Sequence, residues 1–240
     1  MSFDNDTIDA IWCMFLPGMG GAKAMADIIA GNINPSGKLP ITFPNRYEDT
    51  PTYLNFPGEG WNVNYGEGIY VGYRYYDKKM VEPKYHFGYG LSYTTFDCKI
   101  SKTSKCVNKD TSVNPNVKAI TMTDKLDITV NVTNTGSMAG SEVVQLYISD
   151  ERSTLPKPIK ELKDFAKVYL NPGEGREITF TLDKSILSAY DSDLDEWIAE
   201  EGYYNIIIAT SSDSKQICDE IRVYLDTKSP YSYSINSSIK

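Results

Sequence analysis

Histidine is almost absent from this sequence, which contains a single one, His86, among its 240 residues. A metal site built from several histidines is therefore excluded, and any histidine-based catalytic triad would have to use His86. No nucleophile motif of the G-x-S-x-G kind occurs either. We therefore expect His86, which stands between Tyr85 and Phe87, to be a packed or partly exposed structural residue.

Basic clusters and long apolar runs are also missing. The formal net charge is −8 and no basic run occurs, which argues against a nucleic-acid partner. No stretch of 18 apolar residues is present, so we expect no membrane-spanning segment. Residues 1–10 carry three aspartates and lack a basic start, which is not the pattern of a signal peptide. The sequence does not determine the cellular compartment of the protein, and we favour the cytoplasm.

Cysteine is scarce, and no metal or cofactor motif is apparent. The four cysteines, at positions 13, 98, 106 and 218, include no C-x-x-C pair, which argues against zinc or thioredoxin-type chemistry. We favour small buried hydrophobic residues for these cysteines, and the alternative is that Cys98 and Cys106 bridge a hairpin. Asp191, Asp193 and Asp195 alternate as in a calcium loop, but that loop requires glycine at its sixth position and glutamate at its twelfth, and neither is there. We therefore expect a solvated acidic loop and no cofactor.

Residues 1–46 have the pattern of one strand–helix unit. Residues 9–16 are almost continuously apolar, which predicts a strand covered on both faces. A predicted helix follows the Pro17-Gly18 turn and ends at Gly31. Its apolar stripe consists of Ala22, Met25, Ala26 and Ile29. One such unit cannot cover its own apolar faces, so we interpret residues 1–46 as the end of a larger α/β domain.

Residues 47–93 are rich in tyrosine, glycine and proline. They hold ten of the chain's 18 tyrosines, which favours an ordered, aromatic-packed connector over a disordered one. We predict that three of these tyrosines pack the connector against its neighbours: Tyr73, Tyr75 and Tyr76. In an extended segment, Tyr73 and Tyr75 would share one face. Arg74 would then lie on the other face and pair with Asp77 or a backbone carbonyl.

Residues 94–226 alternate apolar and polar side chains, as half-buried strands do. Alternation is clear at 126–132, 144–148 and 178–182, and two further apolar runs cover 203–209 and 221–225. Turn residues separate these runs, at Asn134-Thr135-Gly136, Asn171-Pro172-Gly173 and Glu201-Gly202. About seven short strands spaced in this way predict an antiparallel β-sandwich of the immunoglobulin or fibronectin type III kind. Residues 227–240 form a polar tail.

Two glutamates and a tryptophan in the connector are candidate site residues. Glu59 and Glu67 flank Trp61, and carboxylates beside an aromatic ring are typical of sugar sites. The alternative is that the glutamates are solvated and that Trp61 only covers the tyrosines of the connector. The Pro17–Gly21 turn before the predicted helix matches neither phosphate-binding motif and is interpreted as a tight turn.

Three long motifs, in one consistent order, cover residues 9 to about 226. The first is Leu16-Pro17-Gly18 followed by residues 31–40 (GNINPSGKLP) and 42–44 (TFP). The second is residues 65–77 (YGEGIYVGYRYYD), leading to 87–94 (FGYGLSYT). The third joins residues 134–136 (NTG), 142–147 (EVVQLY), 160–165 (KELKDF) and 171–173 (NPG). Together they resemble the C-terminal part of family 3 glycoside hydrolases, and the Pro57-Gly58-Glu59 loop is most similar to that of bacterial β-glucosidases.

The resemblance implies a plan of a (β/α)8-type barrel, an α/β sandwich domain and a fibronectin type III-like domain. Residues 1–46 would be the C-terminal remnant of the α/β domain, 47–93 the connector and 94–226 the fibronectin type III-like domain. The family hydrolyses terminal β-linked glucose or similar sugars by a retaining mechanism with two carboxylates. Its aspartate nucleophile comes from the barrel and its acid/base glutamate from a loop upstream of Leu16.

Neither catalytic motif has a counterpart in this sequence, so the resemblance assigns no catalytic residue. We expect a non-catalytic C-terminal segment from a truncated, split or incompletely predicted gene, inactive alone. Its expected partners are the missing barrel and α/β domain, and a β-linked glucoside or oligosaccharide in the complete enzyme, with Trp61 as the candidate substrate-binding residue. The alternative is an independent fibronectin type III-like binding or scaffolding module, in which Trp61 and Phe56 bind sugar.

Overall fold

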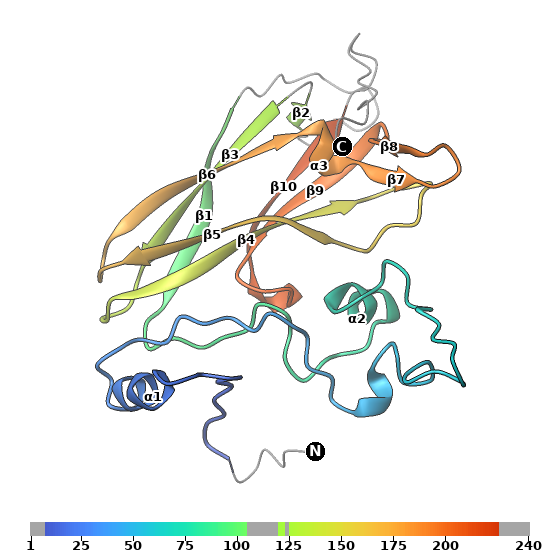
Figure 1. The fold of residues 1–240 in the computed structure, drawn as a ribbon. Coiled ribbons are helices and arrows are strands. Elements are labelled where there is room, and N and C mark those ends of the chain that lie inside the picture. The colour runs from blue at the N-terminus through green and yellow to red at the C-terminus, as the bar shows by residue number, and fades with distance from the viewer. Residues whose placement is uncertain (1–7, 105–119, 123–124, 226–240) are drawn as a thin grey trace.

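The computed structural model describes residues 8–104, 120–122 and 125–225, and its main body is a β-sandwich (Figure 1). One sheet has the order β1-β3-β6 and the other β2-β10-β9-β4-β5. The strands of the first sheet are β1 (Phe96–Thr103), β3 (Lys125–Asn134) and β6 (Gly175–Asp183). Those of the second are β2 (Ile120–Met122), β4 (Gly140–Asp150), β5 (Glu161–Leu170), β9 (Gly202–Ala209) and β10 (Ile217–Leu225). All neighbours pair antiparallel except β2 with β10.

The smaller elements complete the chain. A short helix α3 (Lys184–Leu187) follows β6, and β7 (Ala189–Asp191) pairs with β8 (Glu196–Ile198) as a separate hairpin. A 3-10 turn η3 (Ser214–Gln216) joins β9 to β10. In the part of the chain that is described, no helix has the length and apolar character needed to span a membrane.

The core of the sandwich consists of the apolar residues that alternate along the strands. On β3, Leu126, Ile128, Val130 and Val132 are at most 2% exposed. They face apolar side chains of the second sheet, which include Val144, Leu146, Ile148, Tyr204, Ile206 and Ile208. Burying one side chain of this size stabilises the fold by about 1.5–3 kcal/mol relative to leaving it exposed. The predicted mainly β, antiparallel sandwich is confirmed.

Cys98 is buried in the core, as favoured, but it is disulfide-bonded, and its partner is not the one that the hairpin alternative names. Cys98 on β1 forms a disulfide with Cys218 on β10, with a Cα–Cα distance of 5.7 Å and a sequence separation of 120. It therefore does not pair with Cys106, which lies outside the described residues. Pairing between strands so distant in sequence follows from the sandwich topology, which brings the first strand of one sheet beside β10 of the other. Cys13 is a free, exposed cysteine.

The N-terminal region contains three helical segments and little β-structure: α1 (Gly21–Ile29), the 3-10 turn η2 (Tyr47–Asp49) and α2 (Tyr73–Lys79). Helix α1 is where the sequence predicts it, and Gly31 follows it with a positive φ of 74°. The predicted strand at residues 9–16 is wrong, because this segment has no regular structure. A strand needs a hydrogen-bonded neighbour, and residues 9–16 pair with no strand of the described region.

The N-terminal region lies along one side of the sandwich (blue to teal in Figure 1). It covers part of the outer face of the second sheet, where Tyr147, Ile207 and Ala209 are buried against Tyr73 and Leu162. Because the inner face of β4 is in the core, this strand is buried on both of its faces from Val144 to Ile148. We call the contacts of residues 34–94 with β4, β5 and the β9–β10 turn the connector interface.

Candidate functional site

Trp61 stands at the tip of a tight turn in the connector. The Glu59 amide donates to the Asn62 carbonyl at 3.0 Å, and the Asn62 amide donates back to the Glu59 carbonyl at 3.1 Å. Gly58 precedes the turn with a φ of 103°, and a Cβ there would lie 2.3 Å from the Asn62 carbonyl oxygen, so the turn requires glycine. Trp61 is 103% exposed, so its ring does not cover the tyrosines of the connector.

The two candidate carboxylates lie in different surroundings. Glu59 is exposed on the Trp61 turn, whereas Glu67 is partly buried. The Oε2 atom of Glu67 is buried and has no hydrogen-bond partner among the described residues. Glu59 belongs to the turn that carries Trp61, and Glu67 lies outside the hydrogen bonds that close this turn. The turn is therefore an exposed aromatic and acidic projection.

His86 lies at the connector interface. Its Nε2 atom is 3.5 Å from Glu82 Oε1 and 3.9 Å from Asp213 Oδ2, and its side chain is 15% exposed. The neighbouring Phe87 carbonyl accepts a hydrogen bond from the Ser212 amide at 2.8 Å. This environment agrees with the packed structural histidine that the sequence favours.

Helix α2 contacts β4, β5 and the loop before β5 at the connector interface. The Tyr73 ring meets Tyr147 edge-on at 5.8 Å, and the Tyr73 hydroxyl accepts a hydrogen bond from the Leu162 amide at 2.8 Å. Burial raises the pKa of Tyr147, and Tyr73 and Asp77 raise it further. The predicted packing role of the tyrosines extends to Tyr76, which is 5% exposed.

The extended conformation predicted for this segment is wrong, and so are the predicted partners of Arg74. The segment is helical because it has no glycine or proline between Gly72, which has a φ of 56°, and Met80, which ends it in the left-handed region. Arg74 Nη2 pairs with Glu161 Oε1 at 3.2 Å. Asp77 Oδ2 pairs with Lys160 Nζ at 2.7 Å. Both ion pairs join α2 to the start of β5 and its preceding loop.

Two further contacts hold the other end of the connector interface. Lys38 Nζ lies 2.8 Å from Glu142 Oε1, and the exposed fractions of the two side chains are 13% and 9%. Gly88 has a φ of 83°, and a Cβ there would lie 2.5 Å from Gln145 Nε2 and 2.9 Å from the Cα atom of Ser211. The outward-facing Gln145 of β4 therefore lies directly against the connector.

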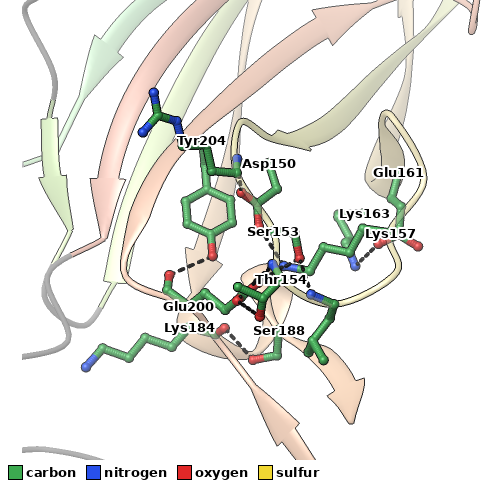
Figure 2. A network of polar contacts seen from close by, with 12 residues as sticks. Asp150, Ser153, Thr154, Lys157, Glu161, Lys163, Lys184, Ser188, Glu200 and Tyr204 are labelled. Carbon is green, nitrogen blue, oxygen red and sulfur yellow. Dashed lines mark hydrogen bonds and ion pairs between the residues drawn. The ribbon is translucent and has the colours of Figure 1, made fainter.

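A polar network fixes the loop between β4 and β5 (Figure 2). Lys157 Nζ lies 2.7 Å from Asp150 Oδ2 and 3.9 Å from Glu200 Oε2, and all three side chains are less than 20% exposed. Glu200 accepts hydrogen bonds from Thr154 and Ser153. Burial raises the pKa of Glu200, but these hydrogen bonds and Lys157 outweigh it and hold the pKa below its ordinary value.

A groove of about 300 Å³ lies between this loop and the α2 region. Tyr70 and Lys78 line one side, and the other is lined by Ser149, Asp150, Ser153 and residues 155–159. The sequence does not reveal this groove, because the residues on its two sides are about 80 positions apart along the chain. The proline-rich stretch Leu155-Pro156-Lys157-Pro158 was the available sign of an ordered loop.

The acidic segment forms the turn between β7 and β8. Asp191 Oδ1 accepts hydrogen bonds from the amides of Asp193 and Leu194, so this carboxylate serves the turn itself. Within the described ranges, no group of three or more His, Cys, Asp or Glu side chains is arranged to hold a metal ion.

Comparison with known proteins gives two family matches. Residues 1–93 match the glycosyl hydrolase family 3 C-terminal domain, and residues 142–212 match the fibronectin type III-like domain. Thermostable β-glucosidase B of Acetivibrio thermocellus is 42% identical over 98% of this chain and 30% of its own length. Probable β-glucosidase K of Emericella nidulans is 44% identical over 79% of this chain and 20% of its own length.

Solved structures of β-glucosidases also match this chain. β-Glucosidase 3B of Thermotoga neapolitana, in complex with α-D-glucose, superposes with a TM-score of 0.79 at 38% identity, over 92% of this chain and 28% of that one. The family 3 β-glucosidase of Bifidobacterium adolescentis gives a TM-score of 0.77 at 38% identity, over 88% of this chain and 29% of that one. The chain thus spans less than a third of the length of these relatives.

Proposed function

Because this chain belongs to glycoside hydrolase family 3, as the C-terminal region of a β-glucosidase, we propose that it supports the catalytic part of such an enzyme. The complete enzyme would hydrolyse terminal β-linked glucosides by a retaining mechanism with two carboxylates. No barrel is found among the described residues, and the chain supplies neither catalytic carboxylate motif. We propose that residues 1–46 are the remnant of the α/β domain and residues 47–93 the connector. Residues 94–226 would then be the fibronectin type III-like domain, and residues 227–240 the polar tail.

The observation that carries this proposal is the uncovered apolar surface of the N-terminal region. Leu16 is 97% exposed, Met19 is 104% exposed and Ile29 is 71% exposed. Trp12 and Phe15 lie in the same region and are 40% and 59% exposed. Several large apolar side chains left exposed within one short segment indicate an interaction site. Its proposed partners are the barrel and the rest of the α/β domain.

Trp61 is the proposed sugar contact of this chain in the complete enzyme. Its ring is fully exposed on a turn that glycine makes possible, so it is available to stack on a sugar. Stacking of one ring contributes about 1 kcal/mol. We propose that Trp61 contacts the leaving-group side of a β-linked glucoside or oligosaccharide.

Complementation tests the supporting role. The purified chain is assayed with a chromogenic β-glucoside, alone and after co-expression with the upstream region of a family 3 β-glucosidase that lacks its own C-terminal part. We expect no turnover from the chain alone and recovered turnover from the pair. Leu16→Glu should reduce recovery, whereas Lys99→Glu, on an exposed position of β1, should not. Turnover by the chain alone that is lost in Glu59→Gln or Glu67→Gln would contradict the proposal.

The role of Trp61 is tested in the same complemented enzyme. Trp61→Ala should raise KM mainly for substrates with an extended leaving group and leave short aryl glucosides nearly unchanged. An equal loss on all substrates would contradict the proposed contact.

A further inference from the structure

We propose that the groove between the α2 region and residues 149–159 binds a neutral oligosaccharide. The inference rests on the proposed function only for the sugar class, β-linked glucose. The groove lies where the connector meets the sandwich, and ligand sites are frequent at such domain interfaces. Its volume of about 300 Å³ is at the lower end of the range for small-ligand sites and suits a short stretch of sugar chain.

The two sides of the groove have complementary surfaces. The half-buried Tyr70 provides an aromatic ring on one side. Leu155 and the 47% exposed Ile159 provide apolar surface on the other. Ser149 is a polar residue of the lining, and Ser153 also lines the groove while its hydroxyl donates to Glu200. An aromatic ring combined with apolar and a few polar lining residues suits a sugar, which has both C–H faces and hydroxyl groups.

The loop that forms one side is held in place before any ligand binds. Pro156 and Pro158 restrict its backbone, and Pro158 is buried. Lys157 anchors it to Asp150, and Glu200 anchors Ser153 and Thr154, as Figure 2 shows. Pre-organisation of this kind lowers the entropy cost of binding.

The local charges favour a neutral ligand over an anion. Lys157 is already paired with Asp150 at 2.7 Å and lies 3.9 Å from Glu200, so its ammonium group is not available to an anionic ligand. Lys78 is the other cation of the groove, and its Nζ lies 5.8 Å from the centre of the Tyr70 ring. One exposed lysine beside a paired lysine is a weak anion site.

Titration of the full 240-residue chain with cellotriose, followed by amide chemical shifts, tests the inference. We expect saturable shifts at Tyr70, Lys78 and residues 149–159. Tyr70→Ala should weaken binding roughly five- to tenfold. Tyr70→Phe, which keeps the ring, should change it less than twofold. Trp61→Ala, in the connector turn, should leave these shifts unchanged.

Three results would overturn the inference. The first is the absence of shifts in the groove at saturating cellotriose, and the second is their loss in Trp61→Ala. The third is that inorganic phosphate shifts the same amides while cellotriose does not, which would make the groove an anion site. If Tyr70→Ala fails to fold, Ile159→Asp on the opposite side replaces it and should weaken binding to a similar extent. Because this experiment needs no upstream domain, its outcome is independent of complementation.

Discussion

The ion pair between Lys160 and Asp77 should control whether the connector and the sandwich unfold together. The two charged atoms are 2.7 Å apart, and the side chains are 12% and 17% exposed. At that distance and an effective dielectric constant of about 20, unit charges attract by about 6 kcal/mol, and desolvation offsets most of this attraction. Removal of Lys160 leaves Asp77 nearly buried without its partner, which costs about 3–5 kcal/mol in fully buried pairs.

Because both side chains keep some contact with water, we expect Lys160→Ala to lower the free energy of unfolding by about 2–3 kcal/mol. For a chain of this size, that corresponds to a fall in melting temperature of about 4–12 °C. Urea denaturation of Lys160→Ala, Asp77→Ala and the double variant gives the coupling between the two residues. The control Lys99→Ala removes an exposed ion pair with Asp97 and should leave the midpoint of urea denaturation nearly unchanged.

Two results would refute this reasoning. If the effects of the two single substitutions on the free energy of unfolding add up to that of the double variant, Lys160 and Asp77 do not stabilise each other. An early connector transition that shifts in Lys160→Ala while the sandwich midpoint does not would show that the two parts unfold separately.

Three further predictions concern Gly88, the Cys98–Cys218 disulfide and Glu200. Gly88→Ala should lower the melting temperature strongly, because the added Cβ would meet Gln145 and Ser211 at a positive φ; a normal melting curve would contradict the tight contact. Reduction of the Cys98–Cys218 disulfide should lower the free energy of unfolding by about 2–4 kcal/mol, measured in urea with and without reductant, with Cys13→Ser as the control. Since the folded pKa of Glu200 lies below its ordinary value of 4.5, its contribution to stability is full above that value and is lost as the pH falls through the folded pKa. Glu200→Gln should therefore show a smaller loss of stability than the parent on acidification, and equal losses would assign the acid sensitivity to other carboxylates.

The sandwich is predictable from the sequence because its determinants are local. Alternation along β3 and β4 marks one buried face, and the Asn171-Pro172-Gly173 turn separates β5 from β6. Helix α1 is also predictable, since its apolar stripe and Gly31 lie within a dozen residues. These patterns need no knowledge of distant residues.

The errors arise where distant residues decide the structure. The apolar segment at 9–16 has the composition of a strand, but it pairs with no strand among the residues that the structure describes. Cys98 finds its partner 120 positions away through the sandwich topology, which spacing alone does not reveal. The groove beside Tyr70 depends on a loop from another part of the chain. Trp61 is exposed as a sugar-binding residue should be, and its role stays a prediction.

The burial of β4 on both faces changes how this region should respond to random substitution. A strand of an ordinary two-layer sandwich tolerates changes at every second position, where its side chains face water. On β4, Gln145 and Tyr147 occupy outward positions and are both less than 10% exposed. A saturation mutagenesis profile should therefore lose its two-residue period along this strand. By the same reasoning, transplanting the sandwich into another protein without residues 34–94 would expose a second hydrophobic surface, so the two parts should be moved as one unit.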